Sequence, residues 1–181
     1  AEERYPTSVF STGDRFVKQD TTDTPDTQLA IFKFEEFTCS WEHKLTAANA
    51  YEQSQIGCYV YGTEGTVHLG WRDGWTFYPA KFDNRKNPLE KIHMASNANE
   101  PDHQNIKELW ADFMQAIDNK SRPISDIEDG YLATNMSLLA MISMKIGRSV
   151  QWDGKSILND PEASVHLQRP YRAPWIYPKM G

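Results

Sequence analysis

The stretch GCYVYGTEGTVHLGWRDGWTFYP, residues 57–79, indicates the fold class of this chain. It contains three short runs of β-branched and aromatic residues, at 57–62, 65–70 and 75–79, which are typical of strands. Gly-bearing links of a few residues separate the runs, and such links are too short for a crossover between parallel strands. The stretch therefore predicts strands that pair antiparallel with their neighbours.

The segment upstream of residue 57 is expected to add strands to this sheet, and the segment downstream of residue 79 is expected to supply the helices that cover it. Upstream, residues 6–12, 27–34 and 37–46 have the composition or the alternation of strands, so about five to seven strands are expected over residues 6–79. Downstream, two apolar stripes at helical spacing lie within residues 103–147. Strands followed by helices predict an α+β fold, an open-faced, mostly antiparallel β-sheet with helices packed on one face.

Capping residues mark the ends of the two predicted helices. Asp102 can cap the first helix, and Ser125 and Glu128 have the spacing of a capping box for the second. Gly147 is placed to end the second helix. A short strand at 149–152 is expected to follow and to join the sheet.

The length of 181 residues fits one domain, so residues 1–181 are expected to form a single unit. Residues 80–102 are polar and without a period, which predicts a long loop that is either a functional flap or a plain connection. The tail at 168–181 combines Pro with Tyr and Trp. It is expected to be an extended arm that packs on its own domain or on a neighbour.

Charge and hydropathy disfavour two classes of partner. The chain has 19 Lys and Arg against 25 Asp and Glu, a net charge of −6, and it lacks the basic footprint of a nucleic-acid-binding protein. It also lacks an apolar run long enough to cross a membrane. Neither nucleic acid nor a membrane is therefore an expected partner. The compartment stays open, with the cytoplasm as the default and export as the alternative.

The common motifs of nucleotide and metal chemistry do not occur in the sequence. There is no GxGxxG after a strand, no GxxxxGK[ST], no HExxH and no GxSxG. The 5 His residues never pair at i,i+2 or i,i+4, so no metal site is expected. We therefore expect no cofactor-binding and no catalytic residue in this chain.

Five side chains are candidates for a substrate cleft, namely Trp41, His43, Arg72, Trp75 and His103. Strand alternation places Trp41 and His43 on one face, where they suit either a substrate or packing in a core or an interface. The same alternation places Glu42 and Lys44 on the other face, where a cross-strand ion pair is expected.

The remaining candidates lie outside that strand. Arg72 and Trp75 flank a turn and could offer a guanidinium and an indole to a sugar or a carboxylate, although such segments are often only turns. His103 stands in the first turn of the first predicted helix. It could act there as an acid or a base, or it could cap the helix and anchor the loop.

Six phrases in fixed order resemble one protein family. They are YPTSV (5–9), YGTEGT (61–66), DHQNIKELWADFMQAI (102–117), RPISDIEDGYLATNMSLLAMISMKIGRSVQWD (122–153), NDPEAS (159–164) and YRAPW (171–175). Together they resemble the C-terminal domain of the Gfo/Idh/MocA oxidoreductases, in particular the bacterial subgroup with a long C-terminal extension. The resemblance covers nearly the whole chain.

The resemblance implies a partner domain and a cofactor outside this chain. Complete members carry an N-terminal Rossmann domain that binds NAD or NADP. Their C-terminal domain contributes part of a cleft for sugars or polyols, and its open sheet face builds a homo-oligomer. The family's cofactor motif, its Glu-Lys-Pro segment and its Asp-x-x-x-His helix all precede the YPTSV phrase and do not occur here. No catalytic residue is therefore carried over.

The expected function follows from this resemblance. The chain should be the substrate-side and oligomerisation domain of an NAD(P)-dependent sugar or polyol oxidoreductase, and it should not be catalytically competent alone. Its expected partners are further copies of itself and a missing N-terminal Rossmann domain. The alternative is a stand-alone carbohydrate-binding or dimerisation module without catalysis.

Overall fold

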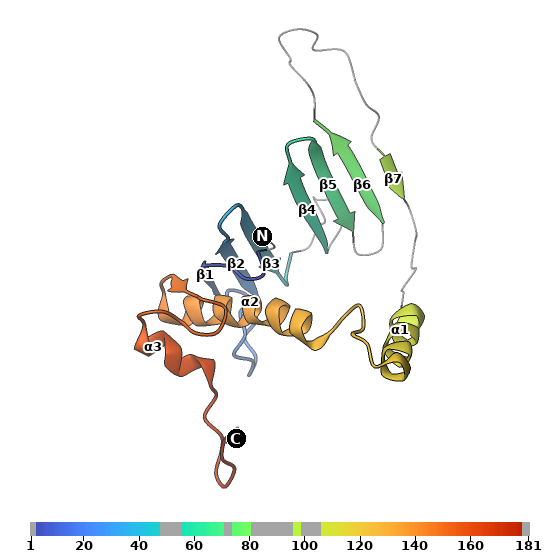
Figure 1. Cartoon of the computed structure of the whole chain (residues 1–181). Helices are drawn as coiled ribbons and strands as arrows, with labels where there is room; N and C mark the ends of the chain where they lie inside the picture. The colour runs from blue at the N-terminus through green and yellow to red at the C-terminus, as the bar shows by residue number, and fades with distance from the viewer. Residues whose placement is uncertain (1–2, 48–55, 71–73, 81–95, 99–105, 179–181) are drawn as a thin grey trace, which may run out of the picture. The chain divides into compact units, whose positions relative to one another are not determined.

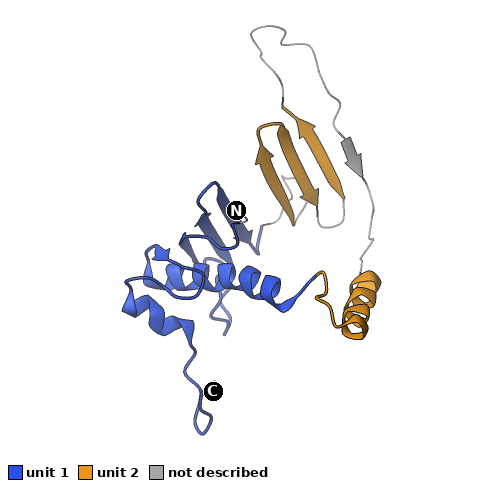
Figure 2. Cartoon of the chain, in the orientation of Figure 1, with its two compact units in different colours: residues 1–47, 125–181 blue, residues 48–124 orange. Residues whose placement is uncertain are grey.

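The computed structural model resolves two compact units, residues 1–47 with 125–181 (unit 1) and residues 48–124 (unit 2), which Figure 2 shows in different colours. Each unit is described by itself below, and the expectation of a single domain over residues 1–181 stays a prediction. The residues that the structure describes are 3–47, 56–70, 74–80, 96–98 and 106–178.

The sheet of unit 1 has four strands in the order β3-β2-β1-β8 (Figure 1). They are β1 (Ser8–Asp14), β2 (Thr27–Lys33), β3 (Thr38–Lys44) and β8 (Val150–Gln151). Every neighbouring pair is antiparallel. The expected short strand after the second helix is confirmed, because β8 pairs with β1 at the edge of this sheet.

The sheet of unit 2 also has four strands, in the order β4-β5-β6-β7. They are β4 (Gly57–Gly62), β5 (Gly65–Gly70), β6 (Trp75–Pro79) and β7 (Ser96–Ala98), again antiparallel throughout. β7 lies inside the predicted loop at 80–102 and corrects that prediction for residues 96–98, whereas residues 81–95 and 99–102 lie outside the described residues. Ser, Asn and Ala are poor strand formers, and β7 is held by pairing with β6 rather than by its own composition.

The α+β class and the antiparallel pairing are thus confirmed, but the described strands form two sheets where one was expected. Short Gly-bearing links connect the strands within the second sheet. Between β3 and β4, residues 45–56 contain neither Gly nor Pro. The Gly-bearing turn that joins neighbouring strands within the second sheet is therefore missing at this point in the sequence.

The helices are α1 (Ile106–Asn119), α2 (Ile127–Ile146), the short α3 (Pro161–Ser164) and the 3-10 turn η1 (Val165–Leu167). α1 and α2 lie where the two apolar stripes predicted helices, whereas α3 and η1 were not predicted. The expected cap of the first helix, at residue 102, lies outside the described residues. The apolar stripe of α1 is exposed, and Ala116 is its one buried residue in the described chain.

The ends of α2 confirm one prediction and correct another. Gly147 ends the helix in the left-handed conformation, with φ 70° and a backbone N–H bonded to Ser143 O at 2.9 Å. The N-cap is Asp126 rather than Ser125, and its side chain accepts from the N–H of Asp129 at 3.0 Å. An Asp cap also places a negative charge at the positive end of the helix dipole.

The core of unit 1 lies between α2 and one face of its sheet (Figure 1). Alternate residues of the strands point to this face, and they meet the apolar side chains of α2. The buried members are Val9, Ala30, Phe32, Phe34, Leu139, Ala140, Ile142, Val150, Trp152, Ile157 and Ala163. α2 covers one face of the sheet. The strand residues that alternate with the buried ones therefore point to the opposite face, which α2 does not cover.

Candidate functional site

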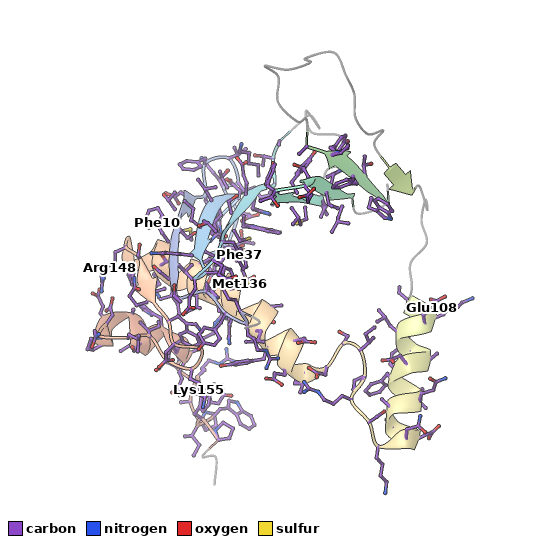
Figure 3. The ribbon with its side chains drawn as sticks, turned by 45° about the horizontal axis from the view of Figure 1, so that its top comes forward. Phe10, Phe37, Glu108, Met136, Arg148 and Lys155 are labelled. Carbon is purple, nitrogen blue, oxygen red and sulfur yellow. The ribbon has the colours of Figure 1, made fainter. Side chains whose placement is uncertain are left out.

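The face of the unit 1 sheet that points away from α2 is here called the open face. Its large apolar residues are Phe10, Leu29 and Ile31, which are 40%, 43% and 41% exposed. Phe10, which Figure 3 labels, lies directly opposite Ile31 in the β1–β2 pair, and residues that are paired in this way have neighbouring side chains. The intervening Val9 and Ala30 point to α2 and are fully buried. Period-two alternation thus produces a core on one face and an apolar surface on the other.

Asp26 organises the loop that joins β1 to β2 at one end of this face. Its carboxylate accepts hydrogen bonds from the N–H groups of Phe16, Val17 and Lys18 at 3.2, 2.8 and 2.8 Å, and from Thr27 Oγ1 at 3.0 Å. These bonds, with the Lys18 N–H contributing most, lower the pKa of Asp26 to about 2. The side chain is 2% exposed and is therefore a buried, ionised anchor.

Arg15 closes the same loop from the other side. Its Nη2 donates to Lys18 O at 3.0 Å and to Asp20 O at 2.6 Å, and it pairs with the Asp20 carboxylate at 3.2 Å. Thr22 donates to Asp20 Oδ1, and this bond is the main reason that the pKa of Asp20 is lowered. Hydrogen bonds between its own residues thus fix the conformation of the loop. Phe16 in this loop is 68% exposed.

Ser143 seats α2 on the covered face. Its Oγ accepts from the N–H of Ser11 at 2.9 Å and donates to Arg148 O at 2.7 Å, and the side chain is fully buried. Ser11 Oγ in turn donates to Leu29 O at 3.1 Å. This chain of bonds ties the C-terminal end of α2 to β1 and β2, which leaves the other face of the sheet uncovered.

Arg148 fixes the segment that follows α2. It donates from Nε and Nη2 to both oxygens of Asp160 at 3.0 and 2.9 Å, and from Nη2 to Glu162 at 2.7 Å. The bonds to Asp160 lower the pKa of that carboxyl, and the two carboxylates together raise the pKa of Arg148. Asp160 also caps α3, so the ion pair holds α3 and the chain that leaves it.

Two of the sequence candidates, Trp41 and His43, lie on β3 and share the face predicted for them. Their cross-strand neighbours are Ala30 and Gln28, which belong to the α2 side of the sheet. Trp41 is nevertheless 52% exposed. Whether this pair serves a substrate or an interface stays a prediction.

The charged residues on the other face of β3 pair differently from the prediction. Lys44 Nζ contacts Glu42 Oε1 along the same strand rather than across strands. The reason is the register, because Glu42 lies opposite Leu29 and Lys44 lies opposite Thr27. Neither charge has an opposite charge facing it on β2.

The other three candidates are not brought to Trp41 and His43 by anything that the structure describes. Trp75 lies on β6 in unit 2, opposite Leu69, and is 41% exposed. Arg72 and His103 lie outside the described residues. The predicted cleft is therefore neither assembled nor excluded by the described part of the chain.

Unit 2 carries an aromatic ladder that the sequence reasoning missed. The rings of Tyr59 and His68 are stacked with centroids 4.4 Å apart, and Tyr61 lies 6.3 Å from Tyr59. Tyr59 and His68 are cross-strand partners in the β4–β5 pair. The spacing Tyr-x-Tyr beside a Gly-bearing turn is the signal that could have predicted this ladder.

Two kinds of site are not found in the described residues. Across the ranges given above, no cluster of three or more His, Cys, Asp or Glu is arranged to hold a metal ion. None of the helices resolved in those ranges combines the length and the apolar character that a bilayer-spanning helix needs.

Comparison with known proteins relates the chain to oxidoreductases by fold. No protein-family model and no curated protein matches it. An oxidoreductase from Agrobacterium radiobacter, solved with NAD+, L-tartaric acid and magnesium, matches with a TM-score of 0.60 and 10% identity, over 81% of this chain and 43% of that one. A protein from Thermotoga maritima proposed to be an oxidoreductase matches with a TM-score of 0.59 and 18% identity, over 81% and 41%.

An NAD-binding protein from Listeria innocua matches with a TM-score of 0.50 and 14% identity, over 84% of this chain and 47% of that one. The chain thus spans less than half the length of each of these proteins. At identities this low, the structural likeness shows a shared fold and nothing more. The chain therefore has the fold of one part of these larger proteins, in agreement with its resemblance to the C-terminal domain of the Gfo/Idh/MocA oxidoreductases.

Proposed function

We propose that this chain is the substrate-side and oligomerisation domain of an NAD(P)-dependent oxidoreductase and is not catalytically competent alone. The fold supports the oxidoreductase part, because the chain matches less than half of an NAD-binding protein and of an oxidoreductase that holds NAD+. The sequence supports the dependence on another domain, because it contains no loop of the dinucleotide-binding type.

The open face is the observation that supports an oligomerisation role. Phe10, Leu29 and Ile31 are each left two-fifths exposed on adjacent strands, while Val9, Ala30 and Phe32, which point to the opposite face of the same sheet, are buried. Burying the remaining apolar surface of the three exposed side chains would stabilise an assembly by roughly 25 cal/mol for each Å² removed from water. Two copies of one sheet face can bury each other by face-to-face packing around a two-fold axis. A homo-oligomer is the simplest partner for such a surface.

A polyhydroxylated substrate, a sugar or polyol, is the finer part of the proposal. The Agrobacterium radiobacter oxidoreductase of the same fold holds L-tartaric acid, which carries two adjacent hydroxyl groups. Adjacent hydroxyls are also what a dehydrogenase of sugars or polyols must recognise. The exposed indoles of Trp41 and Trp75 can stack on the apolar face of a sugar ring.

Cofactor titration tests this function. NADH fluorescence should show no saturable binding to the purified chain, whereas the polypeptide extended upstream by its own coding sequence should bind NADH and contain a GxGxxG motif. Turnover of a sugar by the chain alone with added NAD+ would overturn the proposal. Sugar binding to the chain by calorimetry, with no nucleotide-binding sequence upstream, would favour the stand-alone carbohydrate-binding module instead.

A further inference from the structure

The C-terminal arm, residues 168–178 of the predicted tail at 168–181, is uncovered. Every residue of the arm is exposed, and Trp175 and Ile176 are 72% and 82% exposed. The arm is closed on itself, since the rings of Tyr171 and Tyr177 stack with centroids 5.1 Å apart. The N–H of Trp175 also donates to Arg172 O at 3.0 Å. Such a preformed aromatic knob loses little conformational entropy when it binds.

The charge of the arm is opposite to that of the rest of the chain. All 25 acidic residues lie before Val165, and the sequence after it has Arg169, Arg172 and Lys179 with no Asp or Glu. Neither guanidinium of the arm forms an ion pair with any residue that the structure describes. Aromatic and Arg side chains together are the residues that protein interfaces favour most.

An acidic corner of the same unit has the complementary chemistry. It consists of Glu3, Glu35, Glu36 and Phe37, at the turn between β2 and β3. The Glu3 carboxylate accepts from the N–H groups of Glu35 and Glu36, both at 2.7 Å, so three carboxylates gather at one turn. Phe37, which Figure 3 labels, stacks on the buried Phe34 with ring centroids 4.2 Å apart, and Phe37 is 52% exposed. Glu35 and Glu36 form no ion pair with the described residues.

We propose that the arm of one copy docks on the acidic corner of a second copy, and that the second copy returns the same contact. Arg169 and Arg172 face the carboxylates of Glu35 and Glu36, and the exposed ring of Phe37 offers a surface for a guanidinium or for Trp175. Arm and corner both belong to unit 1 and both are exposed there, so a chain leaves its own corner free. The reciprocal contact is closed by two-fold symmetry. It uses none of the open-face residues and does not depend on the oxidoreductase assignment.

A charge-reversal mixing experiment tests this contact. The arm variant carries Arg169→Glu and Arg172→Glu, and the corner variant carries Glu35→Lys and Glu36→Lys. Both are made in an Ile31→Asp background, so that the open face cannot hold the copies together. Sedimentation velocity at low salt should show that each variant self-associates at least about tenfold more weakly than the Ile31→Asp protein, because like charges then meet.

Mixing the two variants should restore association. In the mixed pair, Glu on one arm meets Lys on the other corner, and the unaltered arm meets the unaltered corner. The control variant carries Lys145→Glu and Lys155→Glu, which change the net charge by the same amount as the two substitutions of the arm variant but lie elsewhere on unit 1. This control should associate as the Ile31→Asp protein does.

Three results would overturn the arm exchange. The first is an Ile31→Asp protein that is monomeric with its arm and corner intact. The second is association that none of the reversals alters. The third is rescue when both sets of changes are placed in one chain but not when the two variants are mixed, which would mean that the arm docks within its own chain. The open-face proposal is judged separately, by whether Ile31→Asp alone changes the assembly.

Discussion

Asp26 is the residue on which the shape of the β1–β2 loop most depends, and its ionisation predicts a pH dependence. Its pKa is about 2, below its ordinary value of 3.8, so its stabilising contribution is complete above pH 3.8 and is lost as the pH falls toward 2. Asp26→Asn removes the charge that the N–H groups of Phe16, Val17 and Lys18 bind. The thermal midpoint of the variant should therefore be several degrees lower at neutral pH.

The difference between the wild type and Asp26→Asn should shrink between pH 3.8 and pH 2, because the wild type loses its charge there. Thermal unfolding followed by circular dichroism at both ends of this range measures it. Asp23→Asn, which removes an exposed carboxylate from the same loop, is the matched control and should change little. An equal loss of stability for Asp26→Asn at every pH would contradict the role of the charge.

Ser143 is a second residue whose side chain contributes to stability, because its hydroxyl group joins α2 to β1. Ser143→Ala leaves the buried N–H of Ser11 without its acceptor and removes a part-buried hydrogen bond to the carbonyl of Arg148. Unsatisfied buried groups of this kind destabilise a protein by about 1–3 kcal/mol. Urea unfolding should show this loss, while Ser137→Ala, on the exposed side of the same helix, should stay within about 0.5 kcal/mol of the wild type. Equal stabilities for the two variants would mean that water replaces the hydroxyl.

The β4–β5 hairpin depends on a glycine that no other residue can replace. Gly65 has φ 152°, and a Cβ built on it would lie 2.4 Å from the carbonyl oxygen of Tyr78 and 2.8 Å from the ring of Phe77. Gly65→Ala must therefore push β6 away from β5. We expect the β-sheet signal of unit 2 to be lost or to melt at a clearly lower temperature.

Gly130 in α2 is the matched control for Gly65. A Cβ at Gly130 meets nothing within 4 Å, and the residue is helical and exposed. Gly130→Ala should therefore stabilise the protein, by about 0.5–1 kcal/mol. Circular dichroism melts of the two Gly→Ala variants should thus move in opposite directions. A Gly65→Ala protein as stable as the wild type would show that the hairpin tolerates a shift of β6.

The assembly as a whole should respond to a charge placed on the open face. Ile31→Asp introduces a carboxylate beside Phe10, where face-to-face packing of two sheets would bury it. Light scattering coupled to size exclusion should show a lower molar mass for this variant than for the wild type. The fold should persist, because Ile31 does not belong to the buried core.

Ile127→Asp makes the same chemical change outside the open face. Ile127 is 88% exposed at the start of α2, where a negative charge is favourable. This variant should keep the mass of the wild type. A wild type that is already monomeric, or an unchanged mass for Ile31→Asp, would remove the open face as an oligomerisation surface.

Features set by neighbouring residues in the chain were predictable. The strands at 57–62 and 65–70, the Gly-bearing turn between them and the end of α2 at Gly147 all match the prediction, because turn geometry and capping depend on local backbone preferences. The sequence placed the N-cap of α2 one residue early, at Ser125 instead of Asp126. Both residue types are good N-caps, and the backbone conformation of the folded chain decides which of them caps the helix.

Features that join distant residues were not predictable. The division of the strands into two sheets, the β7 strand inside a polar segment and the bonds of Asp26 and Ser143 all link residues that periodicity does not relate. The candidate cleft shows the same limit. Alternation correctly placed Trp41 and His43 together, because they share one strand, but nothing in the sequence could relate them to Trp75 on another.

By itself, the sequence determined the class of fold, the succession of strands and then two long helices, and the absence of a dinucleotide-binding motif, because each of these depends on residue type and spacing along the chain. Only the tertiary structure decided which sheet face α2 covers and which is left open, and that the arm and the acidic corner are both exposed. The physical reason is that burial is a property of packing. An alternating strand offers two faces, and the element that packs against it selects one.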